Sequence, residues 1–250
     1  MGQAEGDAGA RGYDIVTIYD CTQFIGKPGG DGRSSTGCIP GAIKLEINKP
    51  RDNYAHDGSG DTLIHVEPGV DAAFVTKPDL KAAKVTIGLL SDKAARENPK
   101  SRQWWYCPPL LRAEWLAASK GDKKAQAAIK TWRNGIYSLS DYGIPGPRIH
   151  GVVIDLYDFS YMAEIWRARV AENIKPWLDL KRPVLPILYL RWKDTGQLYT
   201  HTEARMRIEY AAALCGGRCA IFDGITTTNK VENYADWPLR ELVESIARGE

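Results

Sequence analysis

The stretch GVVIDLY, residues 151–157, is a nearly continuous run of apolar residues that carries an aspartate and a tyrosine near its end. Runs rich in Val, Ile and Leu are typical of strands buried on both faces of a parallel sheet. Asp155 and Tyr157 are two residues apart, so they lie on the same face of such a strand. The stretch therefore predicts a buried strand that presents a carboxylate and a phenol where it ends.

Seven other short apolar runs with turn residues after them are also predicted strands. They cover residues 13–20, 42–47, 62–67, 84–90, 102–107, 184–190 and 219–224. Amphipathic helical patterns lie between them; one is interrupted near Gly121, and another ends in a pair of glycines that can cap it. Eight strands that alternate with helices favour an α/β fold, a single TIM-like (β/α)8 barrel over residues 13–250, after a flexible leader at 1–12.

Composition and motifs exclude several classes of function. The chain of 250 residues has 33 Lys and Arg against 31 Asp and Glu, a net charge of +2, and its basic residues are scattered. The sequence therefore predicts no nucleic-acid partner. It has no apolar run of about 18 residues, which predicts no membrane span. No G-x-G-x-x-G opens a helix after the first strand, so we expect no dinucleotide, and we expect neither another cofactor nor a metal. Composition does not indicate an oligomeric state.

Five cysteines fit neither a zinc site nor a dense disulfide scaffold. Cys21 and Cys38 flank a long glycine-rich loop, and a disulfide between them would close that loop, so we expect the two to lie close together. Five reduced thiols are an equally good interpretation. The first residues have no apolar core, so they are either a flexible leader or what remains after a signal was removed. We expect a secreted or periplasmic protein.

Polar side chains gather at the predicted strand ends. In a (β/α) barrel, chemistry lies at the C-terminal ends of the strands, where the loops converge over the barrel mouth. His65 and Glu67 share a strand face, as Asp155 and Tyr157 do. The groups at these ends are Asp20, Glu67, Tyr106, Asp155, Tyr157, Asp158, Arg191 and Asp223. Carboxylates and aromatics around one mouth, without a metal-ligand cluster or a nucleophile elbow, indicate glycoside chemistry. Aromatic walls, for which 8 Trp and 12 Tyr are available, suit sugar rings.

Each of these residues also has a structural interpretation. Glu67, which precedes Pro68-Gly69, is equally a solvated loop residue, and His65 inside an apolar run is typical of a core histidine. Asp155 could cap the next helix or pair with Arg191 or Arg148.

The order of motifs resembles a bacterial group of hyaluronidase-like glycoside hydrolases with a (β/α) barrel, over nearly the whole chain. The similar segments are IVTIYDCTQFIGKP with IPGAIKLEI, TLIHVEPGVD, WWYCPPLLRAEW, VVIDLYDF, IWRARVAENIKPWLDLKRPVLPILYLRW and AAALCGGRCAIFDG. The resemblance implies a general acid/base at Glu67 and a sugar contact at Tyr157. The chain departs from the family at His65, where the family has an Asp that orients a substrate acetamide, and at Asp223, where a Trp is common.

Three hypotheses follow. The first is a glycoside hydrolase that cleaves a polysaccharide or glycosaminoglycan-like glycan by carboxylate acid/base catalysis. Its predicted catalytic residues are Glu67, His65 and Asp155, and its predicted substrate-binding residues are Asp20, Tyr106, Tyr157, Arg191, Trp192 and Asp223. The second is a catalytically inactive carbohydrate-binding barrel. The third is a different hydrolase that uses His65 with Asp20 or Asp155. A second carboxylate within reach of Glu67 distinguishes the first from the second.

Overall fold

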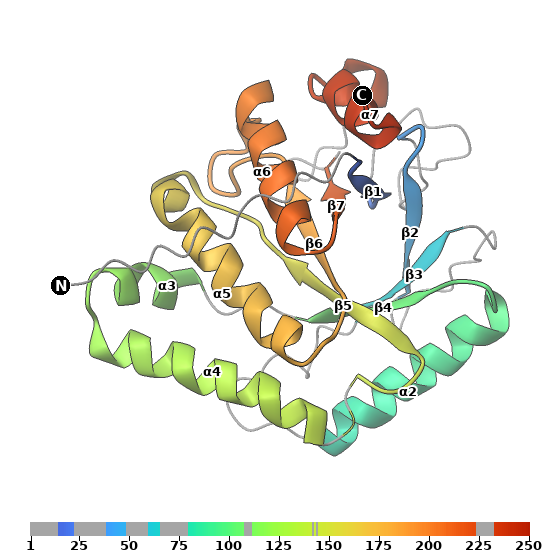
Figure 1. Cartoon of the computed structure of the whole chain (residues 1–250), viewed down its shortest axis with the longest axis vertical. Helices are drawn as coiled ribbons and strands as arrows, with labels where there is room; N and C mark the ends of the chain where they lie inside the picture. Colours follow the sequence, from blue (N-terminus) through green and yellow to red (C-terminus); the bar gives the residue numbers. More distant parts are fainter. Residues whose placement is uncertain are drawn as a thin grey trace.

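The computed structural model describes residues 15–22, 39–48, 60–65, 80–107, 112–141, 143, 145–223 and 233–250. Within these ranges, seven parallel strands close into a barrel in chain order (Figure 1). The strands are β1 (Thr17–Asp20), β2 (Ile43–Asn48), β3 (Asp61–Ile64), β4 (Gln103–Cys107), β5 (Ile149–Asp155), β6 (Val184–Tyr189) and β7 (Arg218–Phe222). The ring closes because β1 pairs with β7 as well as with β2.

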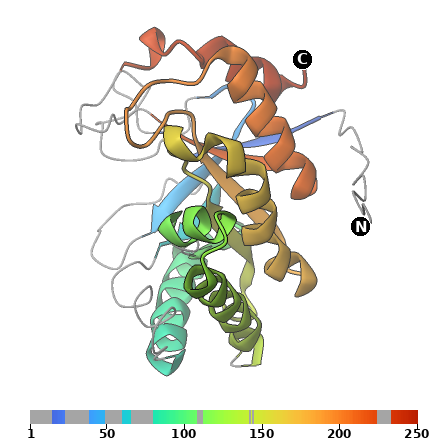
Figure 2. The same ribbon diagram turned by 90° about the vertical axis from the view of Figure 1, so that its left-hand side faces the viewer.

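Helices form the outer layer of the barrel. They are α2 (Leu80–Glu97), α3 (Arg112–Ser119), α4 (Lys123–Asp141), α5 (Trp166–Asp179), α6 (His201–Leu214) and α7 (Arg240–Arg248), with short 3-10 helices η1 (Ser160–Ile165) and η2 (Tyr234–Asp236). Helix α2 contacts β3 and β4, α6 contacts β6 and β7, and α7 contacts β1. Figure 2 shows α5, in gold, between α4 in green and α6 in orange.

The predicted strand over residues 84–90 is wrong, because this segment lies inside helix α2. Ile87 and Leu90 are buried, as is Ala94 one helical turn further on, whereas Val85 and Leu89 are exposed. Burial at spacings of three and four is the helical period. A short apolar run does not distinguish a strand from a helix by itself, and here the polar residues on either side extend the helical pattern.

Each of the other seven predicted strands overlaps an observed strand, and the parallel barrel is therefore confirmed. The eightfold count is not, since the ring in the described part of the chain has seven strands. The predicted leader at 1–12 lies outside the described residues. No helix that the structure describes is long and apolar enough to cross a membrane.

Glycines end helices where the sequence predicts them. Gly121, with φ of 90°, lies in the turn between α3 and α4. At the end of α6, Gly216 has φ of 69°, and the Gly217 amide donates to the Ala212 carbonyl oxygen at 2.8 Å. This bond satisfies a carbonyl that has no partner within the helix.

The barrel has an inner and an outer core. The inner core fills the closed ring with alternate strand residues, among them Tyr19, Trp104 and Val153. The outer core, between the sheet and the helices, contains the neighbouring residues Ile18, Trp105 and Val152, among others. Because successive residues of a strand point to opposite faces, one residue of shift decides whether a side chain reaches the interior.

Cys21 is buried, but its predicted disulfide partner Cys38 lies outside the described residues. Cys215 and Cys219 are buried free thiols. Burial raises the pKa of both, so they stay protonated and unreactive at neutral pH.

Candidate functional site

The candidate site is the barrel mouth, which we define as the C-terminal ends of the strands together with the residues that follow them. On β5, Val153 belongs to the inner core. Asp155 is two residues further on, so its carboxyl group lies on the same face, at the top of the packed interior. The strand therefore delivers a carboxylate to the mouth, as the sequence predicts.

Hydrogen bonds hold both oxygens of Asp155. The Tyr157 amide donates to Oδ1 at 2.7 Å, and the Tyr106 hydroxyl donates to Oδ2 at 3.2 Å. Only 6% of the residue is exposed. The carboxylate is thus fixed in orientation by groups from β4 and from the chain just after β5.

His65, directly after β3, lies beside the same group. Its ring meets the Tyr106 ring edge to face, with centroids 4.6 Å apart and an interplanar angle of 77°. His65, Tyr106 and Asp155 therefore form a continuous row across β3, β4 and β5. The imidazole touches the phenol that holds the carboxylate.

An aromatic wall continues the row across β6 and β7. The Tyr157 ring lies 5.6 Å from that of Tyr189 and 5.9 Å from that of Phe222, with which it is stacked. The Lys193 amino group lies 5.4 Å from the centroids of both tyrosine rings. This side of the mouth therefore offers flat apolar surface with a cation over it.

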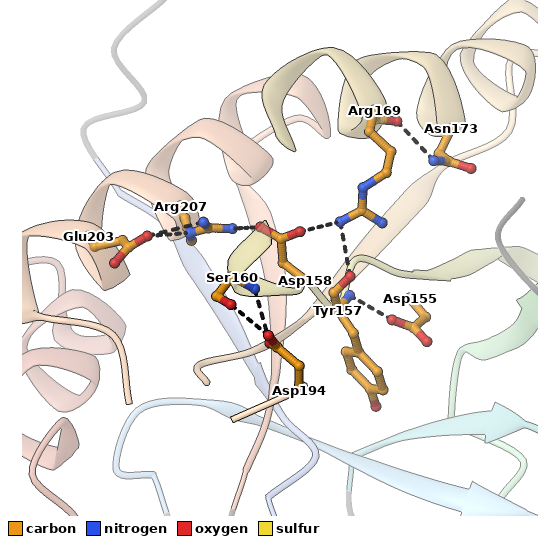
Figure 3. A network of polar contacts seen from close by, with 9 residues as sticks. All are labelled: Asp155, Tyr157, Asp158, Ser160, Arg169, Asn173, Asp194, Glu203 and Arg207. Carbon is orange, nitrogen blue, oxygen red and sulfur yellow. Dashed lines mark hydrogen bonds and ion pairs between the residues drawn. The ribbon is translucent and has the colours of Figure 1, made fainter. Parts of the chain in front are cut away.

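A buried polar network fixes the segment that carries Tyr157 (Figure 3). The Asp158 carboxylate is fully buried and accepts from Arg169 at 3.2 Å and from Arg207 at 2.8 Å. Arg169 also donates to the Tyr157 carbonyl oxygen at 2.9 Å, and the Asp158 carbonyl oxygen accepts from the Lys193 amide at 2.7 Å. Asp158 thereby ties together the β5 and β6 ends on which Tyr157 and Lys193 stand.

The Arg207 side of this network lies in an aromatic cage. Its guanidinium lies 4.5 Å from the Trp166 ring, 4.8 Å from Trp192 and 4.4 Å from Tyr199. Burial raises the pKa of the Tyr199 hydroxyl. Trp192, a predicted substrate contact, therefore packs against this arginine.

Asp20 has a structural environment too. It is fully buried, and its Oδ1 accepts from the Thr22 amide at 2.8 Å and the Thr22 hydroxyl at 2.6 Å. Its Oδ2 accepts from the Ile39 amide at 2.9 Å. Asp20 is two residues from Ile18, which belongs to the outer core, so it lies on the face opposite the barrel interior.

Asp223 and Arg191 pair with each other. Asp223 Oδ1 accepts from Arg191 Nε at 2.7 Å, and Oδ2 accepts from the Trp237 indole at 3.0 Å. Both members of the pair are buried. Among Asp20, Asp155 and Asp223, the side chain on the inner face is that of Asp155.

The structure thus brings His65, Tyr106, Asp155 and Tyr157 together at the mouth. Glu67, the predicted acid/base, lies outside the described residues. Tyr189 and Phe222 were not predicted, although each is two residues from an inner-core residue, so alternation could have found them. No sequence signal marks Lys193, because its place over the Tyr157 and Tyr189 rings depends on how the ends of β5 and β6 meet. Among the described residues, no cluster of three or more potential metal ligands occurs.

Comparison with known proteins gives a distant likeness only. No protein-family model matches the chain, and no curated protein matches its sequence. Among solved structures, bee venom hyaluronidase in a monoclinic crystal form is 13% identical over 74% of this chain and 71% of its own, with a TM-score of 0.45. The same bee venom enzyme in complex with a hyaluronic acid tetramer is 12% identical over 75% and 70%, with a TM-score of 0.48. At this level the likeness assigns this chain neither a reaction nor a substrate.

Proposed function

We propose that this barrel is a glycoside hydrolase whose site is the mouth, with Asp155 and Glu67 as its two carboxylates. The observation that supports the proposal most is the setting of Asp155. It is an oriented carboxylate on the inner face, with the Tyr106 hydroxyl, the Tyr157 amide and an aromatic wall beside it. Glycosidic cleavage needs one group that protonates the leaving oxygen and a second that stabilises the oxocarbenium-like centre.

In this proposal Glu67 is the acid and Asp155 the second carboxylate. Tyr106 and the Tyr157 amide keep Asp155 pointed at one place, so little reorganisation is needed as positive charge develops on the sugar ring. Tyr157, Tyr189 and Phe222 provide the flat surface against which the apolar face of a pyranose can lie. His65 supports the site through Tyr106 and is two residues before Glu67 in the sequence.

The test is hydrolysis of hyaluronan, chondroitin and xylan by the wild type and by Asp155→Asn and Glu67→Gln. We expect the wild type to cleave at least one of them and each variant to be slower by about 10²–10⁴-fold, the usual contribution of acid/base groups. Asp92→Asn is the control, because Asp92 is an exposed carboxylate on α2 that pairs with Arg148. Its rate should equal that of the wild type.

The stereochemistry of the product then assigns the role of Asp155. On xylan, which has no acetamide that could attack in its place, retention of the anomeric configuration means that Asp155 acts as a nucleophile, and inversion means that it activates water. Equal rates for the wild type and Asp155→Asn would refute the assignment of this carboxylate. If the wild type binds a glycan of the panel and cleaves none, the protein is a carbohydrate-binding barrel.

A further inference from the structure

An aromatic pair, the exposed Tyr161 and the half-buried Phe159, lies just beyond the mouth. Tyr161 is 60% exposed, and the other large hydrophobic side chains exposed in the described ranges are aliphatic. The Tyr161 ring lies 5.3 Å from that of Phe159, at an interplanar angle of 40°. We call these two residues the aromatic lip. Together they present adjoining ring surfaces in place of a single isolated side chain.

The chain that carries the lip is anchored on both sides. Ser160, between the two aromatics, donates from its amide and its hydroxyl to Asp194, at 3.0 and 2.5 Å (Figure 3). Met162, next to Tyr161, is buried, and its amide donates to the Phe159 carbonyl oxygen at 2.9 Å. A rigid platform loses little conformational entropy when a ligand binds, which favours binding.

The lip is continuous with the aromatic wall of the mouth. Phe159 follows Tyr157 by two residues, and the intervening Asp158 is the centre of the buried network. Asp194, which holds Ser160, directly follows Lys193, whose amino group lies over Tyr157. The same two strand ends, those of β5 and β6, therefore carry both the wall and the lip.

The chemistry around the lip suits a sugar. A pyranose ring has an apolar face of C–H groups and a rim of hydroxyls, so its site needs an aromatic surface with polar groups next to it. Here Lys193 and Asp194 are both exposed beside the segment that carries the two rings. A protein partner would be expected to meet a wider apolar patch than two rings.

We propose that the aromatic lip is an outer subsite that binds a sugar unit of the glycan chain remote from the bond in the mouth. This inference rests on the proposed function, because the occupant of the lip is an extension of the ligand in the mouth. The inference predicts that long glycan chains bound in the mouth also contact the lip, whereas short ones do not reach it.

The experiment compares tetrasaccharides and decasaccharides of hyaluronan, chondroitin and xylan by calorimetry and by kcat/KM. For the wild type we expect the decasaccharide to bind more tightly than the tetrasaccharide. Tyr161→Ala and Phe159→Ala should each weaken decasaccharide binding by about two- to tenfold, the size of an aromatic contact, and leave tetrasaccharide binding unchanged. Tyr161→Phe, which keeps the ring, should restore the preference.

Leu89→Ala is the control for loss of an exposed apolar side chain, because Leu89 is 66% exposed on α2. It should behave as the wild type with both lengths. If the lip variants leave decasaccharide binding unchanged, or weaken both lengths equally, the lip is not a subsite, although the proposed function stands. If the wild type binds none of the six oligosaccharides, the proposed function fails and the outer subsite fails with it.

Discussion

At the residue scale, the carboxylates at the strand ends differ by the face on which they lie. Asp155 shares the inner face with Val153, whereas Asp20 shares the outer face with Ile18. Asp223 follows Ile221 on the outer face in the same way and pairs with Arg191. These three aspartates have similar positions along their strands but different surroundings, because alternation places only the Asp155 side chain on the inner face of the barrel.

His150, in β5 at the opposite end of the barrel, is the residue for which we predict a pH effect on stability. Burial lowers its pKa from 6.5, as do the charges of Arg102 and Arg218, while Asp61 acts in the opposite direction. Since the unfolded chain takes up the proton first, the contribution of His150 to stability is present above pH 6.5 and is lost as the pH falls below it.

His150→Gln should therefore show a smaller loss of unfolding free energy between pH 7 and pH 5 than the wild type. Urea unfolding at a series of pH values measures this difference. A variant that loses as much stability on acidification as the wild type would contradict the assignment. Carboxylates titrate in both proteins, so the comparison isolates the histidine.

At the element scale, β5 depends on a glycine. A Cβ on Gly151 would lie 2.3 Å from the Pro183 carbonyl oxygen and 2.7 Å from the Trp104 ring. Trp104 fills the barrel interior and donates from its indole to Asp61 at 2.9 Å, so it cannot move aside freely. The glycine lets the chain before β6 and the tryptophan of β4 both approach β5.

Gly151→Ala should lower the unfolding free energy by about 1–3 kcal/mol, the usual cost of an overpacked core. Urea denaturation of the purified variant is the measurement. Gly88→Ala is the matched control, because Gly88 lies within helix α2 and an added Cβ there meets no atom within 4 Å. That control should be neutral or stabilising, as alanine favours a helix over glycine. Equal stability of the two variants would contradict the packing argument.

The network around Asp158 joins two strand ends with two helices. Asp158→Asn should leave Arg169 and Arg207 without their full counter-charge in a buried place, at a cost of about 3–5 kcal/mol. Asp179→Asn is the control, since its ion pair with Lys175 is exposed and screened by solvent, and its unfolding free energy should stay close to that of the wild type. Urea titration measures the unfolding free energies of both variants. Similar losses for the two would contradict the claim that the buried ion pairs of Asp158 contribute more to stability than the exposed pair of Asp179.

At the scale of the whole molecule, ligand binding and catalysis should be separable. A glycan that binds only the folded barrel stabilises it by about 2.7 kcal/mol at 100 times its Kd, which is about 5–10 °C in Tm for a chain of this size. Asp155→Asn should keep this rise in Tm while it loses hydrolysis, because the aromatic wall is intact. Thermal unfolding of the wild type and of Asp155→Asn, with and without each polysaccharide, measures this rise in Tm. Loss of the Tm rise in Asp155→Asn would make Asp155 a binding residue.

The sequence by itself determined the elements of the barrel, because burial on both faces leaves a readable run of apolar residues at every strand. It also identified Asp155 and Tyr157 as a pair on one strand face, since alternate residues of a strand point the same way. The strand prediction failed at 84–90. The apolar spacing of this segment also fits a helix, and the residues on either side of it extend the helical pattern.

Only the tertiary structure decided which polar groups act together. Arg191 pairs with Asp223, and Asp158 pairs with one arginine from α5 and another from α6, because contacts between elements depend on how the ring closes. Lys193 lies over Tyr157 and Tyr189 for the same reason. Period and alternation are local properties of a chain, whereas a pair of side chains far apart in sequence exists only once the barrel brings their strands side by side.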